Sequence, residues 1–365
     1  MKGGSWIGIQ GAADLKAMVF GEGGARSTFN SAWMQGFFQS PHSGLEYGLV
    51  QVAGGPCGVL ASVQAYMVRH MLFVENRMDI AGINEATFNR ALLHALADIL
   101  WQAGGDKSAK VAVKGSHSMT GEDQDLMRSL KYKPDGLTEM LSVVVCSSRA
   151  EVLDALAAHQ GVLTERAGPG VPLVLYSVML SRGLHNIRGD VGTMDGLPRL
   201  MGQHDYCSQE MVNLFLVGRA VANAFDGDKD LDGMKLTGVH KRSNVGMLTL
   251  FEHYDSMQVG SRLKDPITPV WVVCSESHFS VIFSCDAEEV QSATASGGGF
   301  DLHYYDELAK QDEPIRLSVS YDLSKASDPK VILDHSKDMT PPLEHCIRTK
   351  WAHCHVSWNG TDPIL

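Results

Sequence analysis

A cysteine with the surroundings of a nucleophile lies in the first quarter of the chain. The segment Gly54–Gly58 reads Gly-Gly-Pro-Cys-Gly and ends an extended run. Proline favours the first turn of a helix, so Cys57 is predicted to lie at or beside a helix N-terminus. Unpaired N–H groups and the positive dipole end favour a thiolate there, and the glycines leave room for a substrate backbone. The alternative is a buried cysteine that begins a core helix, although such a cysteine needs neither the glycines nor the proline.

The residues after Cys57 predict the helix that would hold it. Apolar side chains recur at helical spacing at Leu60, Val63, Met67 and Met71, which is the stripe of a helix with one buried face. We expect this helix to end near Phe73. A thiol in this position can act as a nucleophile only if a base elsewhere in the chain takes its proton.

His278 is the best candidate for that base among 15 histidines. Residues 270–275 and 278–283 are predicted to be two strands joined by a turn. In the second strand, alternation places His278 on the face opposite three large apolar side chains. A histidine fixed at the start of a buried strand is a better base than loop histidines such as His42, His117 or His185. A cysteine at a helix start, followed two hundred residues later by a histidine on a strand, is the chain order of papain-like hydrolases.

Composition indicates an ordinary globular protein, and the expected helices and strands place it in the α+β class. The 365 residues are 44% hydrophobic and 20% charged, with a formal net charge of −11. This acidity argues against nucleic acid or an anionic membrane as the main partner and suits a partner with a basic face. We find no signal peptide and no run of about 18 apolar residues, and therefore predict no membrane span.

Seven cysteines at irregular spacing predict free thiols in a reducing compartment. Zinc-ligand spacing is lacking near the C-terminus, so we predict no metal and no other cofactor. The acidic segment Asp226–Gly233 resembles a calcium loop, but Val239 stands where a bidentate glutamate belongs, which favours an acidic turn.

The remaining segments give a coarse secondary structure. Polar, breaker-rich residues 104–136 are predicted to be a flexible surface insertion, and residues 171–180 fit a strand or a helix equally well. The other expected elements are helices over 29–38, over 83–101 with Asn84 as its cap, over 149–159 and over 208–225, and a buried strand over 141–146.

Three segments carry a resemblance to a known family. Residues 49–61, 208–220 and 271–281 resemble the nucleophile motif, the central helix and the histidine strand of the MINDY family of cysteine deubiquitinases. Residues 342–365 resemble the tail of its larger, FAM188-like branch. The resemblance runs from about Phe20 to the last residue, although 104–136 match poorly. It implies a single catalytic domain over 1–365 with a papain-like architecture.

The resemblance also implies an activity and the roles of three residues. The activity is that of a cysteine isopeptidase that trims polyubiquitin and prefers lysine-48-linked chains. The nucleophile is carried to Cys57, the general base to His278 and the oxyanion donor to Gln51, which without the resemblance would be taken for a strand-end glutamine facing water. The family supplies no acid to orient the histidine. Asp301 and Asp306 are the nearest later carboxylates, and the sequence selects neither.

Two other interpretations remain open. One is a catalytically silent scaffold of the same fold that binds ubiquitin, and the other is a thiol amidase or acyltransferase that acts on small molecules. In the preferred interpretation the partners are ubiquitin and polyubiquitin chains, and the compartment is the cytoplasm, with the nucleus as a second location. The sequence leaves the oligomeric state open.

Overall fold

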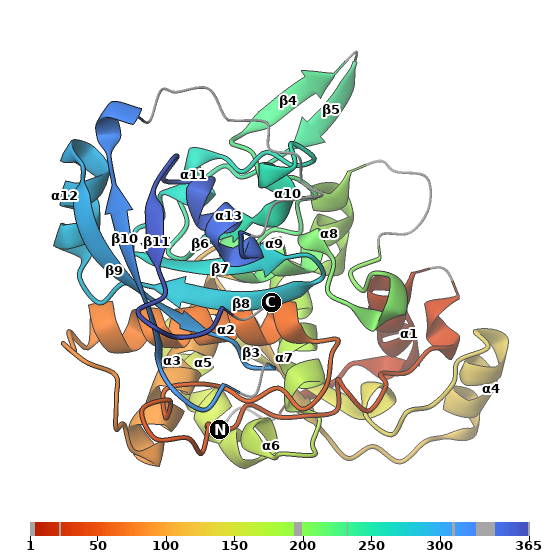
Figure 1. The fold of residues 1–365 in the computed structure, drawn as a ribbon. Coiled ribbons are helices and arrows are strands. Elements are labelled where there is room, and N and C mark those ends of the chain that lie inside the picture. The colour runs from red at the N-terminus through yellow and green to blue at the C-terminus, as the bar shows by residue number, and fades with distance from the viewer. Residues whose placement is uncertain are drawn as a thin grey trace.

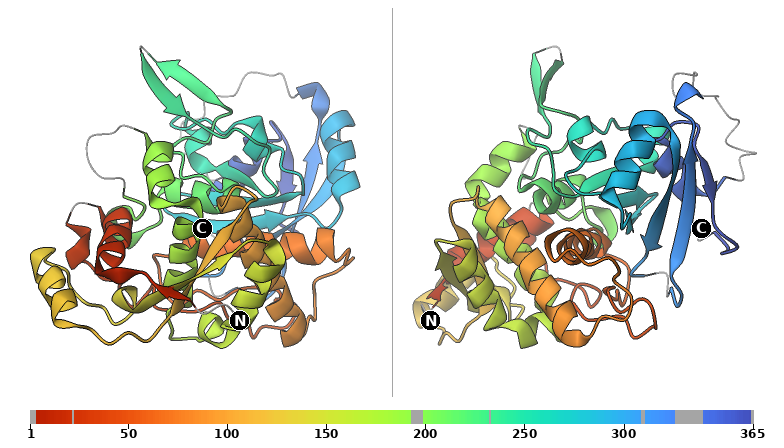
Figure 2. Two further views of the ribbon diagram at one scale, coloured as in Figure 1. Left: turned by 180° about the vertical axis from the view of Figure 1, so that it is seen from behind. Right: turned by 90° about the vertical axis from the view of Figure 1, so that its left-hand side faces the viewer.

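The computed structural model describes residues 4–21, 23–192, 199–231, 233–308, 311–325 and 340–363. Helices from the N-terminal half lie against one face of a six-stranded sheet that the C-terminal half builds (Figure 1). The two further views in Figure 2 show the same division, with red and orange helices on one side and blue strands on the other. This mixed architecture agrees with the predicted α+β class.

The large sheet has the strand order β11-β10-β9-β8-β7-β6. Its neighbours are antiparallel except for β6 and β7, which run parallel. The predicted strands 270–275 and 278–283 are confirmed as the β7–β8 hairpin. The strand bounds are β6 Gly246–Thr249, β7 Val270–Ser275, β8 His278–Phe283, β9 Gly298–Tyr305, β10 Ile315–Tyr321 and β11 His355–Ser357.

Alternation along β7 and β8 gives the sheet two buried faces. Val272 and Val281 join the core that contains α2, whereas Trp271 and Ile282 join a second core on the opposite face. The second core is covered by short helices, with Trp351 fully buried among them. Because both faces are covered, these strands are apolar at nearly every position. The short helices in this half are α10 Leu250–His253, α11 Ser261–Lys264, α12 Ala287–Ser296 and α13 Pro342–Arg348.

The helix that begins with Cys57 is the central element of the fold. Helix α2 spans Cys57–Arg69 and continues as one π-helical stretch, His70–Val74, close to the predicted end. Every residue of α2 except Arg69 is buried, between α3, α9 and the β7–β8 hairpin. The window Cys57–Val74 is the one helical stretch of the described chain that is long and apolar enough to cross a membrane. As 83% of that window is buried inside the fold, its apolarity is that of a core helix.

A second, three-stranded sheet lies in the N-terminal half, in the order β1-β3-β2. Strand β3, Leu141–Cys146, confirms the predicted strand but not its burial, because only its two end residues are buried. Strand β1 is Ser5–Trp6. The prediction that residues 104–136 are a flexible surface insertion is wrong, because this segment contains regular secondary structure. It contains strand β2, Ala109–Lys114, which pairs with the whole of β3 and has mostly buried side chains, and helix α4, Gly121–Ser129. The strand has only four apolar residues, interrupted by Lys110 and surrounded by polar residues, and these polar neighbours concealed it.

The helices of this half mostly follow the sequence. Helix α3, Glu85–Ala103, has Asn84 as its N-cap, because the Asn84 side chain accepts from Thr87 N at 2.9 Å. Helix α5, Arg149–Ala157, is confirmed, and the undecided segment 171–180 lies in helix α7, Gly170–Arg182. The other helices here are α1 Gly8–Phe20, α6 Gln160–Thr164 and α8 Leu184–Val191, with 3-10 turns η1 Gly24–Arg26, η3 Thr138–Met140 and η4 Gln203–Asp205.

Two predicted helices are wrong in extent. Residues 29–38 form turns and extended chain instead of a helix, because the indole of Trp33 donates to Asp205 O at 2.9 Å and the segment is held by distant partners. The helix expected over 208–225 is α9, Gln209–Val217, and it stops at Gly218, whose φ of 70° ends the helix in a left-handed conformation. The acidic segment near 228 forms the hairpin β4 Asp228–Leu231 and β5 Met234–Thr237, which projects from the body in Figure 1.

Candidate active site

The fold brings the predicted nucleophile and the predicted base together. Cys57 is the first residue of α2 and is 2% exposed, with Pro56 as the preceding cap residue. His278 is the first residue of β8, and its ring lies close enough to Cys57 for the thiol to raise the pKa of His278. The packing of α2 across β7 and β8 therefore joins two residues that are 221 positions apart.

An aspartate holds the other side of the imidazole. Nε2 of His278 lies 2.8 Å from both carboxylate oxygens of Asp306, which leaves Nδ1 for the thiol. The ring remains 30% exposed at its side chain, whereas Asp306 is 5% exposed. Cysteine, histidine and aspartate thus form a line in which the base is oriented by a third group.

The electrostatics of this line favour a charged histidine. Burial lowers the pKa of His278, but the hydrogen bonds and charges of Asp306 and Cys57 outweigh burial and raise it to about 10. An imidazolium beside the Asp306 carboxylate is consequently the stable form at neutral pH.

Asp306 is itself fixed by a small hydrogen-bond network. The Tyr304 hydroxyl donates to it at 3.2 Å and the Leu308 N–H at 2.8 Å. Its own N–H donates to Gln311 Oε1 at 3.1 Å. Of the two carboxylates that the sequence left undecided, Asp301 pairs instead with Ser318 and Arg316.

A sequence signal for Asp306 exists in the strand order. Strand β9 runs antiparallel to β8, with Tyr305 opposite Val281, so the end of β9 returns to the start of β8. The first carboxylate after β9 is therefore the one that reaches His278. This reasoning needs the pairing of β8 with β9, which periodicity alone does not provide.

Gln51 lies on the nucleophile side and not in water. Gln51 is only 5% exposed, and its Nε2 donates to Ala53 O at 2.7 Å. Its backbone N–H donates to Glu307 O at 3.0 Å, which ties it to the segment that carries Asp306. An amide nitrogen has two protons, so the second remains for another acceptor. The role of oxyanion donor stays a prediction that this placement supports.

Two buried glutamines that the sequence did not single out position the extended segment around Gln51. Gln35 Nε2 donates to Val50 O at 3.0 Å and its Oε1 accepts from Val52 N at 2.9 Å, so it brackets Gln51. Gln64 of α2 accepts from Leu49 N at 2.6 Å and donates to the carbonyl two residues earlier at 3.1 Å. Both are at most 1% exposed. The extended segment before Cys57 is thus bound to α2 by Gln64 and to the segment 29–38 by Gln35, and each amide pairs both of its ends.

A tyrosine and a glycine join the extended segment before Cys57 to strand β9, which leads to Asp306. The Tyr305 hydroxyl donates to Leu49 O at 2.7 Å. Its ring lies directly on the backbone of Gly48, where a Cβ would overlap it. Glycine is therefore needed at position 48 for close approach rather than for a turn.

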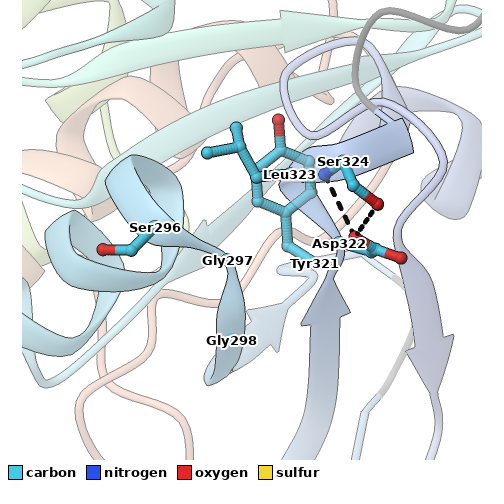
Figure 3. Close-up of a pocket in the computed structure, with 7 residues that line it drawn as sticks. All are labelled: Ser296, Gly297, Gly298, Tyr321, Asp322, Leu323 and Ser324. Carbon is cyan, nitrogen blue, oxygen red and sulfur yellow. Dashed lines mark hydrogen bonds between the residues drawn. The ribbon is translucent and has the colours of Figure 1, made fainter.

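The described residues contain no cluster of three or more histidine, cysteine or acidic side chains that could hold a metal ion. All seven cysteines are free thiols. A hollow of about 560 Å³ lies where α12 meets the start of β9 and the end of β10, as Figure 3 shows. It is lined by seven residues without a cysteine or a histidine: Ser296, Gly297, Gly298, Tyr321, Asp322, Leu323 and Ser324. Because it lies at the opposite end of β9 from Asp306, it is separate from the cysteine–histidine pair.

Comparison with known proteins agrees with this geometry. The family model "Deubiquitinating enzyme MINDY-3/4, conserved domain" matches residues 16–360. The chain belongs to the MINDY-3/4 family. It is 41% identical over 98% of its length to the mouse probable ubiquitin carboxyl-terminal hydrolase MINDY-4, of which the match covers 47%, and 40% identical to the human protein over 98% of the chain and 46% of that protein.

A second branch of the family is more distant. The bovine ubiquitin carboxyl-terminal hydrolase MINDY-3 is 32% identical over 75% of this chain and 65% of its own length. The MINDY-3/4 domain here spans about half the length of the MINDY-4 proteins it matches. No solved structure matches the chain, so the papain-like architecture remains a prediction.

Proposed function

We propose that this MINDY-3/4 domain is a thiol isopeptidase that hydrolyses polyubiquitin, preferentially lysine-48-linked chains. The single observation that carries the proposal is the line from Cys57 through His278 to Asp306, with a charged imidazole beside the thiol. Family membership supports ubiquitin as the substrate. The related MINDY-4 proteins are named probable ubiquitin carboxyl-terminal hydrolases.

In the first half of the reaction, the Cys57 thiolate attacks the isopeptide carbonyl carbon. The carbonyl oxygen becomes an oxyanion, which accepts hydrogen bonds from the Cys57 N–H and the free amide proton of Gln51. When the tetrahedral intermediate collapses, the C–N bond breaks and the His278 imidazolium gives its proton to the leaving lysine amine. The products are a free lysine and a thioester between Cys57 and the ubiquitin carboxyl terminus.

In the second half, neutral His278 acts as the base. It takes a proton from a water molecule as that water attacks the thioester, and a second oxyanion forms at the same donors. Collapse expels the Cys57 thiolate, leaves the imidazolium of His278 beside it, and releases the ubiquitin carboxylic acid, which loses its proton to solvent and becomes a carboxylate. Asp306 keeps Nε2 protonated throughout, so that Nδ1 always faces the sulfur.

The acidic character of the chain supports a basic partner. A net charge of −11 favours encounter with a positively charged face and disfavours nucleic acid. The cytoplasm, with the nucleus as a second location, is the proposed compartment, and the seven free thiols are consistent with it.

A ubiquitin probe with an electrophile at its C-terminus tests the proposal. Wild type should form a covalent adduct at Cys57, Cys57→Ala should not, and the neighbouring Cys207→Ala should react like wild type. Binding without an adduct would favour a silent ubiquitin-binding scaffold. An enzyme that ignores the probe would favour a thiol amidase or acyltransferase of small molecules.

The linkage preference needs its own measurement. Initial rates on chains of each linkage, at matched length and concentration, should be highest for lysine-48-linked chains. Equal rates on all linkages would remove the preference while leaving the isopeptidase activity in place.

A further inference from the structure

One buried carboxyl group beside the active site has no hydrogen-bond partner. Glu307 follows Asp306 in the chain and is 4% exposed, and neither of its carboxylate oxygens has a partner. Such a group is costly to bury in ionised form, because a desolvated carboxylate needs a cation or several donors. The ion pairs of the described residues include none to Glu307, so it lacks the partners of a structural carboxylate.

The groups that face Glu307 disfavour a second negative charge. Asp306 lies beside it on its own segment, the Cys57 side chain of α2 is near enough to act on it electrostatically, and His278 of β8 is the single cation among these neighbours. Burial raises the pKa of Glu307 well above its ordinary range, and Asp306 and then Cys57 raise it further against the opposing effects of its own backbone N–H and of His278. Three tyrosines are also near enough to interact electrostatically with this carboxyl group: Tyr47, Tyr304 and Tyr305.

A second unpaired atom lies next to this segment. Oε1 of Gln51 is buried without a partner, although an amide oxygen can only accept hydrogen bonds. The backbone bond from Gln51 N to Glu307 O, 3.0 Å long, places the two residues side by side. A carboxylate could not satisfy Oε1, whereas a carboxylic acid is a donor and would satisfy both groups with one hydrogen bond.

We propose that Glu307 is held in its protonated form and donates its carboxyl O–H to Oε1 of Gln51. Glu307 is then a positioning residue that orients the amide toward the oxyanion, with Ala53 O holding one Nε2 proton. With the oxygen end fixed, the other Nε2 proton points to where charge develops. The kinetic consequences of this proposal rest on the proposed isopeptidase function. The protonation state of Glu307 does not depend on that function.

Infrared difference spectroscopy tests the protonation without any substrate. Glu307→Gln is neutral, of the same shape and still a donor, so it should fold like wild type. The wild-type minus Glu307→Gln spectrum at pH 7 should contain the C=O stretch of a carboxylic acid. Only carboxylate bands in that spectrum would overturn the proposal, and this result is independent of whether the protein cleaves ubiquitin.

Chain-cleavage kinetics test the positioning role. Glu307→Leu should lower kcat about tenfold or more and leave KM for polyubiquitin nearly unchanged, since a misaimed oxyanion donor acts in the transition state. Glu307→Gln should restore kcat to within about threefold of wild type. Loss of activity in Glu307→Gln would show that Glu307 acts through its charge, and full activity of Glu307→Leu would show that it has no role. Either result overturns the proposal.

A double-mutant cycle identifies the partner. In a Gln51→Ala background, Glu307→Leu should cost almost nothing more, because the amide it positions is gone. If the fold-losses in kcat of the two single variants multiply in the double variant, the proposed link between Glu307 and Gln51 is overturned. The matched control is Glu344→Gln, a buried glutamate that already pairs with Arg348 and Trp358 away from the site. If wild type cleaves no ubiquitin substrate, the proposed function fails while the infrared result still stands.

Discussion

The two arms of the candidate site are built from different physics. The nucleophile arm, residues 47–57, is held by neutral hydrogen bonds from buried amides such as Gln35 and Gln64. The base arm, His278 and the turn after β9, is held by an ion pair and carries the strongly shifted pKa of His278. Neutral bonds keep their strength across pH, whereas an ion pair exists only while both partners are charged. The shape of the nucleophile arm should therefore be independent of pH, and the chemistry of the base arm should not.

The largest effect should come from the two groups at which the arms meet. Cys57→Ala and His278→Ala should each lower kcat by about 10⁴-fold or more, and the double variant should be no worse, because nucleophile and base act as a unit. Steady-state cleavage of polyubiquitin measures this, with Cys207→Ala and His42→Ala as controls that retain activity. Near-normal turnover by His278→Ala would assign the base to another histidine.

The next effect concerns the orientation and charge of the base arm. Asp306→Ala should lower kcat by about 10²–10⁴, the range that general acid–base catalysis contributes. Asp306→Asn should be milder, since its side-chain oxygen still accepts from Nε2 of His278, but the charge is gone. Because Asp306 and Cys57 together outweigh burial and raise the pKa of His278 to about 10, wild-type kcat/KM should persist to about that pH. In Asp306→Asn, the loss of kcat/KM at alkaline pH should begin at a lower pH than in wild type.

The same pair makes a stability prediction with a definite sign. The pKa of His278 is raised on folding, so its contribution is fully present below pH 6.5 and is lost as the pH rises through about 10. The difference in unfolding free energy between wild type and Asp306→Asn should shrink over that window in denaturant titrations. A difference that is constant from pH 6 to pH 10 would show that Asp306 does not stabilise the charged form of His278.

A smaller and pH-independent effect is expected on the nucleophile arm. Gln51→Ala should lower kcat by about 10²–10³ and leave KM nearly unchanged, the cost of removing one oxyanion donor. Gln51→Glu should be at least as damaging because it sets a carboxylate against the developing charge. Unlike Asp306→Asn, Gln51→Ala should not move the alkaline limb of kcat/KM. A kcat within threefold of wild type would remove Gln51 from the mechanism.

The smallest effect should appear in stability rather than in chemistry. Gln64→Leu leaves a buried N–H of Leu49 and a buried carbonyl without partners, which should cost about 1–3 kcal/mol of unfolding free energy. The exposed Gln124→Leu on α4 is the matched control and should stay within about 0.5 kcal/mol. Equal unfolding free energies for the two variants would show that the hydrogen bonds of Gln64 do not hold the extended segment before Cys57 in place.

The chain by itself determined the local elements that carry the chemistry. Helical spacing after Pro56 located α2, and alternation with a two-residue turn located the β7–β8 hairpin, with Cys57 and His278 at their first residues. Asn84 as a cap and the strand at 141–146 were equally readable. Periodicity and capping are short-range properties, and the residues concerned are neighbours in sequence.

Only the tertiary structure decided which distant groups face one another. Asp306 was indistinguishable from Asp301 until the pairing of β9 with β8 returned it to His278. Strand β2 lay concealed in a polar segment because its partner, β3, is what makes it a strand. Gln35 and Glu307 gave no local signal at all, since their meaning depends on which backbone atoms or charges they are buried against. Burial, strand pairing and electrostatic coupling are relations between residues far apart in the chain, and only the fold creates them.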